Sequence, residues 1–173
     1  TNTWDAASNR VQLEMNGTTY QYVYDTTAGI PAVVEERIGN APVYYFREPN
    51  GALIARYDST NGIRYYHYDE LGSTRLLTDS SGNVTDSYSY DAYGSLIWHE
   101  RYSGSIDQPY QYVGALGYYT HYQDPYFGLL QLGVRFYDPE IGRFTQREPL
   151  PSVVYTYDYA QGRPTLWSDA TGL

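Results

Sequence analysis

The stretch Tyr66-His67-Tyr68-Asp69-Glu70-Leu71-Gly72-Ser73-Thr74-Arg75-Leu76-Leu77-Thr78-Asp79 decides the fold. Its aromatic run ends at Tyr68, where Asp69 can cap a turn through its own side chain. Gly72 can then take the positive φ that closes the turn, since glycine has no Cβ to clash. The stretch therefore predicts a tight turn between two β-strands.

The same unit recurs along the chain. An aromatic residue and an Asp, followed three or four residues later by Gly, occur at Tyr24-Asp25…Gly29, Tyr57-Asp58…Gly62, Tyr90-Asp91…Gly94 and Tyr137-Asp138…Gly142, with a relaxed copy at Trp4-Asp5. Asp58 follows Asp25 by 33 residues, Asp69 follows Asp58 by 11, and Asp91 follows Asp69 by 22, and all three steps are multiples of eleven. Turn signals at this spacing are typical of all-β proteins.

The segments between the turns are rich in aromatic and β-branched residues, which favours strands over residues 18–24, 63–68 and 84–90. Two Asp-Pro-x-x-Gly turns, at residues 124–128 and 138–142, predict a single strand from Leu129 to Tyr137 between them. Helix is expected to be short, with residues 153–160 as the best position. The predicted organisation is a β-sheet body over residues 1–149 and a C-terminal tail over residues 150–173.

The composition supports an antiparallel β-sheet and excludes several classes of protein. The 173 residues include 23 Tyr, whose apolar ring and polar hydroxyl suit half-buried strand faces. All 11 basic residues are Arg, the net charge is −9, and an acidic surface disfavours nucleic acid as a partner. The chain has no Cys, so it has no disulfide and no Cys metal site, and no apolar run is long enough to span a membrane.

The stretch 66–79 resembles the hallmark repeat of the RHS/YD-repeat family, and Tyr90-Asp91-Ala92-Tyr93-Gly94 continues the resemblance. Residues 135–144, Arg-Phe-Tyr-Asp-Pro-Glu-Ile-Gly-Arg-Phe, are similar to the core signature of that family, with Asp138, Pro139 and Gly142 forming its turn. The resemblance implies a large curved sheet that winds into a hollow, secreted or surface-directed shell. It also implies a C-terminal payload inside the shell.

Family members close the core with Asp-Pro-x-Gly-Leu and are cut after the Leu, so the resemblance implies cleavage after Leu173. Here Asp169-Ala170 replaces the closing Asp-Pro, and Arg147-Glu148-Pro149 replaces Arg-Asp-Pro. An aspartyl-type cut needs one charged and one protonated carboxyl group beside the scissile carbonyl. The candidate acids are Glu148, supported by Arg147, with Asp158 or Asp169 as the second. The alternative assigns these acids to turns and ion pairs.

Two other functions fit the same sequence. Unpaired sheet edges predict pairing with upstream repeats or with other copies of the chain, which would build a filament or tube. The tyrosine stripes suit either glycan binding or cross-strand ladders, and the ladder is favoured because the tyrosines follow the strands. His67, His99 and His121 lack the close spacing of metal motifs and are expected to pack, so the sequence indicates no metal, no cofactor and no conventional enzyme.

Overall fold

The computed structural model describes residues 1–27, 31–124, 126–148, 157–169 and 171–172. Ten strands form one antiparallel sheet, and each strand pairs with its neighbours in sequence order. They are β1 (Asn2–Trp4), β2 (Arg10–Met15), β3 (Thr18–Asp25), β4 (Ala32–Ile38), β5 (Ala41–Arg47), β6 (Leu53–Asp58), β7 (Gly62–Tyr68), β8 (Thr74–Thr78), β9 (Val84–Tyr90) and β10 (Leu96–Arg101). The predicted all-β class and the three predicted strands are confirmed.

The predicted turn chemistry joins these strands. In the turn after β7, Oδ1 of Asp69 accepts hydrogen bonds from the backbone N–H groups of Leu71 and Ser73, and Gly72 has φ +87°. Asp91 accepts the same pair of bonds in the turn after β9. Gly29, in the turn after Asp25, lies outside the described residues.

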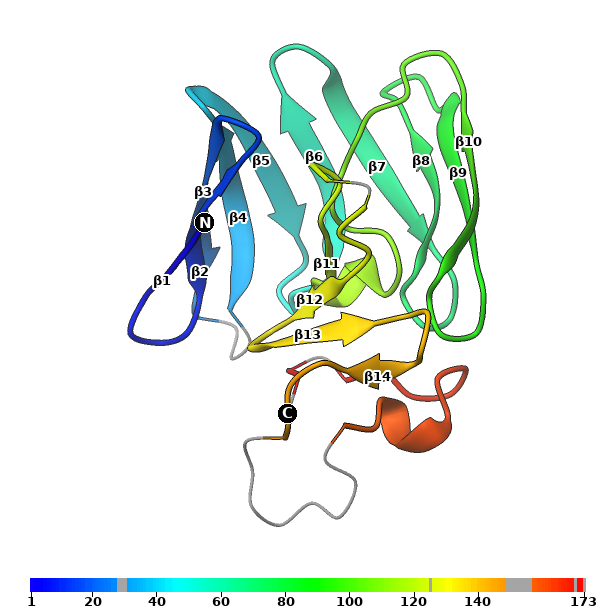
Figure 1. Ribbon diagram of the computed structural model, residues 1–173. Coiled ribbons are helices and arrows are strands. Elements are labelled where there is room, and N and C mark those ends of the chain that lie inside the picture. The colour runs from blue at the N-terminus through cyan, green and yellow to red at the C-terminus, as the bar shows by residue number, and fades with distance from the viewer. Residues whose placement is uncertain (28–30, 125, 149–156, 170, 173) are drawn as a thin grey trace.

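The sheet curves strongly, and the chain that follows β10 runs inside the curve (Figure 1). We call residues 102–124 the crossing segment. It contains the 3-10 turn η1 (Gly114–Leu116) and the short strand β11 (Tyr119–Thr120). Its tyrosines pack edge-on against tyrosines of the sheet, with 5.8 Å between the ring centroids of Tyr22 and Tyr119 and 5.0 Å between those of Tyr45 and Tyr110.

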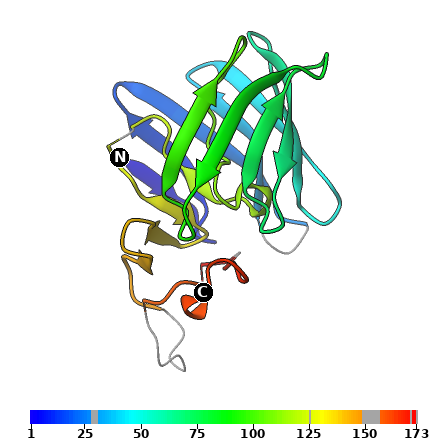
Figure 2. The same ribbon diagram turned by 90° about the vertical axis from the view of Figure 1, so that its right-hand side faces the viewer.

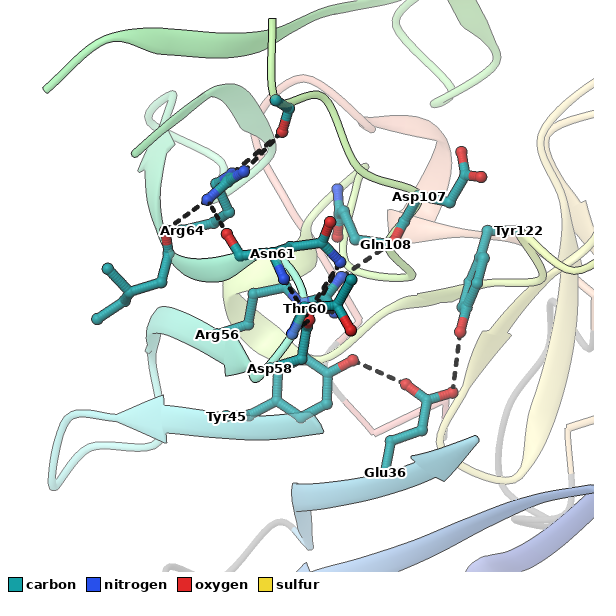
Figure 3. Close-up of polar contacts among 12 residues, drawn as sticks. Glu36, Tyr45, Arg56, Asp58, Thr60, Asn61, Arg64, Asp107, Gln108 and Tyr122 are labelled. Carbon is teal, nitrogen blue, oxygen red and sulfur yellow. Dashed lines mark hydrogen bonds and ion pairs between the residues drawn. The ribbon is translucent and has the colours of Figure 1, made fainter. Parts of the chain in front are cut away.

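Three sheet residues hold the crossing segment through polar contacts (Figure 3). Arg56 Nη1 donates to the carbonyl of Asp107 at 3.0 Å, and Arg64 Nη2 donates to the carbonyl of Gly104 at 2.7 Å. Glu36, which is fully buried in β4, accepts hydrogen bonds from the hydroxyls of Tyr45, Tyr119 and Tyr122. The two arginines and Glu36 therefore bind the crossing segment inside the curve of the sheet.

The described residues that follow the crossing segment form, together with β11, a second, smaller unit at one end of the large sheet, as both views show (Figures 1 and 2). A four-stranded antiparallel sheet pairs β11 with β12 (Leu130–Leu132), β13 (Arg135–Asp138) and β14 (Arg143–Phe144), and η2 (Ala160–Gly162) follows. Its core contains Tyr118, Tyr137, Phe144 and Tyr159. None of the helices in the described ranges is long and apolar enough to cross a membrane.

The prediction of one strand from Leu129 to Tyr137 is wrong. Residues 133–134 form a tight turn, and β12 pairs with β13 as a hairpin. Gly133 has φ +49°, which breaks the extended conformation. Half of the predicted helix position, residues 153–156, lies outside the described residues.

Candidate functional site

Arg135, the first residue of β13, lies at the centre of the predicted C-terminal site. Its Nη2 is 2.9 Å from Oε2 of Glu148 and 3.5 Å from Oδ2 of Asp169. Its Nε donates to the carbonyl oxygen of Gly172 at 2.5 Å. One guanidinium therefore contacts two of the predicted acids and the backbone of Gly172, the residue before Leu173.

The guanidinium of Arg135 is buried and held in place. The side chains of Arg135 and Glu148 are only 4% and 5% exposed. The Cζ atom of Arg135 lies 3.6 Å from the ring centroid of Phe144, so the cation stacks on an aromatic face. A buried arginine that contacts carboxylates binds them more strongly than it would in water, because the surroundings screen the charges less.

Asp169 shapes the backbone of the closing segment. Its Oδ1 accepts from the N–H of Thr171 at 3.2 Å and from the N–H of Gly172 at 2.9 Å. The Tyr118 hydroxyl accepts from the N–H of Asp169 and donates to its carbonyl. Asp169 therefore caps a turn in the closing segment, and Oδ2 of the same carboxylate also contacts Arg135.

The closing segment packs on the β12–β13 hairpin at backbone distance. A Cβ placed on Gly172, which has φ +67°, would lie 2.1 Å from the carbonyl oxygen of Leu132. Only glycine fits this contact without moving backbone. Gly172 thus lies directly against the end of β12, in the hairpin whose second strand begins with Arg135.

The other predicted site residues lie at different places. Asp158 is exposed and forms an isolated β-bridge with Arg143, and Arg147 is exposed. The guanidinium that contacts Glu148 is that of Arg135, which our sequence analysis did not single out. Its position as the first residue of the core signature, between apolar neighbours, is the signal that could have identified it. Leu173, the predicted cleavage position, lies outside the described residues.

The core-signature turn anchors this site to the large sheet. Oδ1 of Asp138 accepts from the N–H of Glu140, and Gly142 has φ +65°. The hydroxyl of Tyr137 donates to the carbonyl of Tyr93 at 2.7 Å, in the turn after β9. Asp138 and Gly142 therefore lie in a tight turn between β13 and β14.

The histidines contact neighbouring side chains in the structure. His99 stacks on Tyr88 and its Nε2 lies 2.9 Å from Oδ1 of Asp86. The Nε2 of His121 lies 2.6 Å from Arg10 Nη1. Within the described residues, no group of three or more His, Cys, Asp or Glu side chains could hold a metal ion.

The fold and the C-terminal cluster define a class of protein. Its members have an antiparallel sheet of repeated hairpins, followed by a smaller unit in which a buried arginine contacts two acids. The Teneurin YD-shell family matches residues 4–161, and the chain belongs to this family. It is an RHS/YD-repeat protein, as its turns predicted.

The similar proteins are much longer than this chain. The tRNA3(Ser)-specific nuclease WapA of Bacillus spizizenii is 28% identical over 98% of this chain, which spans 7% of that protein. Toxin protein Tse5 of Pseudomonas aeruginosa is 33% identical over 64% of this chain and 8% of its own length. The TcdB2-TccC3-Cdc42 crystal structure aligns over 99% of this chain and over 10% of the chain in that structure, with a TM-score of 0.68 and 17% sequence identity. The fold is therefore that of a shell segment.

Proposed function

We propose that this chain is the C-terminal core of a secreted β-shell that encloses a payload, and that the shell separates from the payload by self-cleavage after Leu173. The shell module itself follows from the family and the fold. The payload is supported by relatives that carry toxin and nuclease names, such as the Burkholderia cenocepacia double-stranded DNA deaminase toxin A. Secretion is proposed on the same basis. The body over residues 1–149 would be wall, and residues 150–173 would carry the cut.

One observation carries the cleavage proposal: Arg135 contacts Glu148, Asp169 and the carbonyl of Gly172 together. The carbonyl of Leu173 follows that of Gly172 by one residue, and consecutive Cα atoms are about 3.8 Å apart. The scissile carbonyl would therefore lie one residue beyond the carbonyl that is bonded to Arg135, the guanidinium that contacts Glu148 and Asp169. Positioning of this kind is a large part of catalysis in general.

The chemistry is the addition of one water molecule across a peptide bond. One carboxylate takes a proton from water as the oxygen attacks the Leu173 carbonyl carbon, and the other carboxyl group donates its proton to the leaving nitrogen. The C–N bond breaks, giving a carboxylate on Leu173 and a free amine on the payload. The charge of Arg135 would hold the acids and the adjoining carbonyl in line for this transfer.

The test is a chain extended beyond Leu173 by an inert reporter domain. We expect spontaneous cleavage, followed by gel electrophoresis and mass spectrometry, and a rate at least about 100-fold lower in Glu148→Gln and in Asp169→Asn, since each loses a proton-transfer group. Asp25→Asn, in an exposed turn, is the matched control. Undiminished cleavage in both acid variants would rule out this mechanism. Asp158→Asn and Arg147→Gln in the same assay test the two remaining predicted residues.

A second function, a filament or tube subunit, is favoured by the last strand of the sheet. In the described part of the chain, β10 is hydrogen-bonded to β9 alone, and its Ile97 and Trp98 are 64% and 63% exposed. Open strand edges with apolar side chains invite pairing with another chain. Electron microscopy tests it: regular fibres of the purified protein would support assembly, and their disappearance in an Ile97→Lys variant would locate the contact.

A further inference from the structure

A cavity of about 320 Å³ lies between the N-terminal strands and the crossing segment. Its lining includes Arg10, Tyr22, Arg47, Tyr110, Tyr119 and Gln131. The volume is at the lower end of the range of about 300–1,000 Å³ that is typical of small-ligand sites. The proposed cleavage cluster does not include any of these six residues.

The charge of the lining is unusual for this protein. The chain has a net charge of −9, yet the described residues around the cavity include two arginines and no Asp or Glu. Glu36, which interacts electrostatically with Arg10, accepts a hydrogen bond from Tyr119 and does not line the cavity, and burial raises its pKa. His121 contacts Arg10 through Nε2, and its pKa is lowered to about 3 by burial and then by the charge of Arg10. The cavity therefore presents positive charge.

Among the residues that the structure describes, three buried polar atoms of the lining have no hydrogen-bond partner: Arg10 Nε, Arg47 Nη2 and Gln131 Oε1. Arg10 is 2% exposed and Gln131 is 8% exposed. Buried polar atoms in proteins are nearly always paired, so a cluster of three unpaired ones around one cavity indicates a missing partner. Two of the three are cationic donors and the third is an acceptor.

Aromatic rings fix the two guanidinium groups. The Cζ atom of Arg10 lies 5.0 Å from the ring centroid of Tyr22 and 4.6 Å from that of Tyr119, and Cζ of Arg47 lies 5.2 Å from that of Tyr110. Arg47 is further held by bonds from Nε to the carbonyl of Val33 and from Nη1 to the carbonyl of Gly51. The remaining donors are thus held in fixed positions, which favours binding.

We propose that this cavity binds a carboxylate joined to an apolar or aromatic body that also carries an N–H donor, the chemistry of an acylated amino acid or of an acidic residue in a peptide. The guanidinium groups pair the carboxylate. The tyrosine walls cover the apolar body, and Gln131 Oε1 accepts from the N–H. The proposal does not depend on the cleavage proposal.

The test is calorimetric titration of the intact chain with N-acetylphenylalanine and with its neutral twin, N-acetylphenylalaninamide. We expect the acid to bind at least about tenfold more tightly than the amide, because only the acid pairs with the arginines. Arg47→Gln should reduce the difference to less than about threefold. The control, Arg37→Gln, replaces an exposed arginine that pairs with Glu35 outside the cavity and should leave it unchanged.

A capped peptide, acetyl-Phe-Asp-Phe-amide, and its Asn twin distinguish the two sources of the ligand. Preference for the Asp peptide assigns the site to an acidic residue of a polypeptide, and preference for the free acid alone assigns it to a small molecule. Equal affinity of wild-type protein for each acid and its neutral twin would overturn the proposal. That comparison needs no variant, so it remains decisive if Arg47→Gln fails to fold.

Discussion

Single glycines decide how closely the units of this protein approach one another. Gly142, in the core-signature turn, has φ +65°, and a Cβ there would lie 2.6 Å from the ring of Tyr93. Gly39, in the hairpin between β4 and β5, has nearly the same φ of +61° with nothing within 4 Å of a Cβ. A comparison of Gly142 with Gly39 therefore separates the cost of backbone strain from the cost of a steric clash.

We expect Gly142→Ala to destabilise the protein more than Gly39→Ala. Both variants incur roughly 1–2 kcal/mol for an L-residue at positive φ. Only Gly142→Ala also forces a methyl group into an aromatic ring, which adds about 1–3 kcal/mol. Urea unfolding followed by circular dichroism measures the difference, and equal losses for the two variants would show that Tyr93 moves aside without cost.

At the scale of the element, the crossing segment is held partly by a buried acid. Burial raises the pKa of Glu36, and hydrogen bonds from Tyr45 and Tyr119 and the charge of Arg56 oppose the rise. An acid whose folded-state pKa is raised contributes stability at pH values below its unfolded pKa, and the contribution is lost as pH rises through the folded pKa.

We therefore expect Glu36→Gln to gain stability relative to the wild type as the pH rises above about 4.5, the ordinary pKa of the residue. Gln is nearly isosteric but does not ionise. Glu35→Gln, one residue along on the same strand and paired with Arg37, is the matched control and should show no such trend. Unfolding free energies between pH 4 and 8 measure it, and parallel curves for Glu36→Gln and wild type would contradict it.

The contrast between prediction and structure is clearest for these elements. Asp69 and Gly72 predicted their turn because the signal is local: a side chain caps its own backbone and a glycine takes a positive φ. The crossing segment was not predicted, since Tyr119 meets Tyr22 across 97 positions of sequence. Tyrosine ladders were expected between neighbouring strands, whereas Tyr22 and Tyr45 contact tyrosines of the crossing segment. Arg135 was missed for the same reason, because its partners lie in segments far away in the sequence.

At the scale of the whole molecule, the two hydrophobic cores draw on different parts of the chain. The core of the ten-stranded sheet includes Leu13, Leu77 and Tyr110 and, among its described members, no residue beyond Tyr122. The second core includes Tyr159, whose ring centroid lies 4.3 Å from that of Tyr137. The proposed division at residue 149 therefore cuts the second core and spares the first.

A chain that ends at residue 149 should keep the large sheet and lose order around β12 to β14. Removing Tyr159 and Gly172 exposes Tyr118, Tyr137 and Arg135, so the smaller unit loses packing and polar partners. Hydrogen exchange should show protected amides in β7 to β9 and faster exchange in β12 to β14. Complete unfolding of the shortened chain would mean that the two units form one cooperative body.

The order of strands in the sheet also sets an order of assembly. Each hairpin joins neighbours in sequence, whereas the contacts of the crossing segment close loops of up to 111 residues, between Arg10 and His121. Closing long loops costs more entropy than closing a hairpin. We expect a chain leaving the ribosome to add its hairpins one at a time and to gain the crossing segment last. Until then the tyrosine face is open to water, which makes the unfinished sheet the form most prone to aggregation.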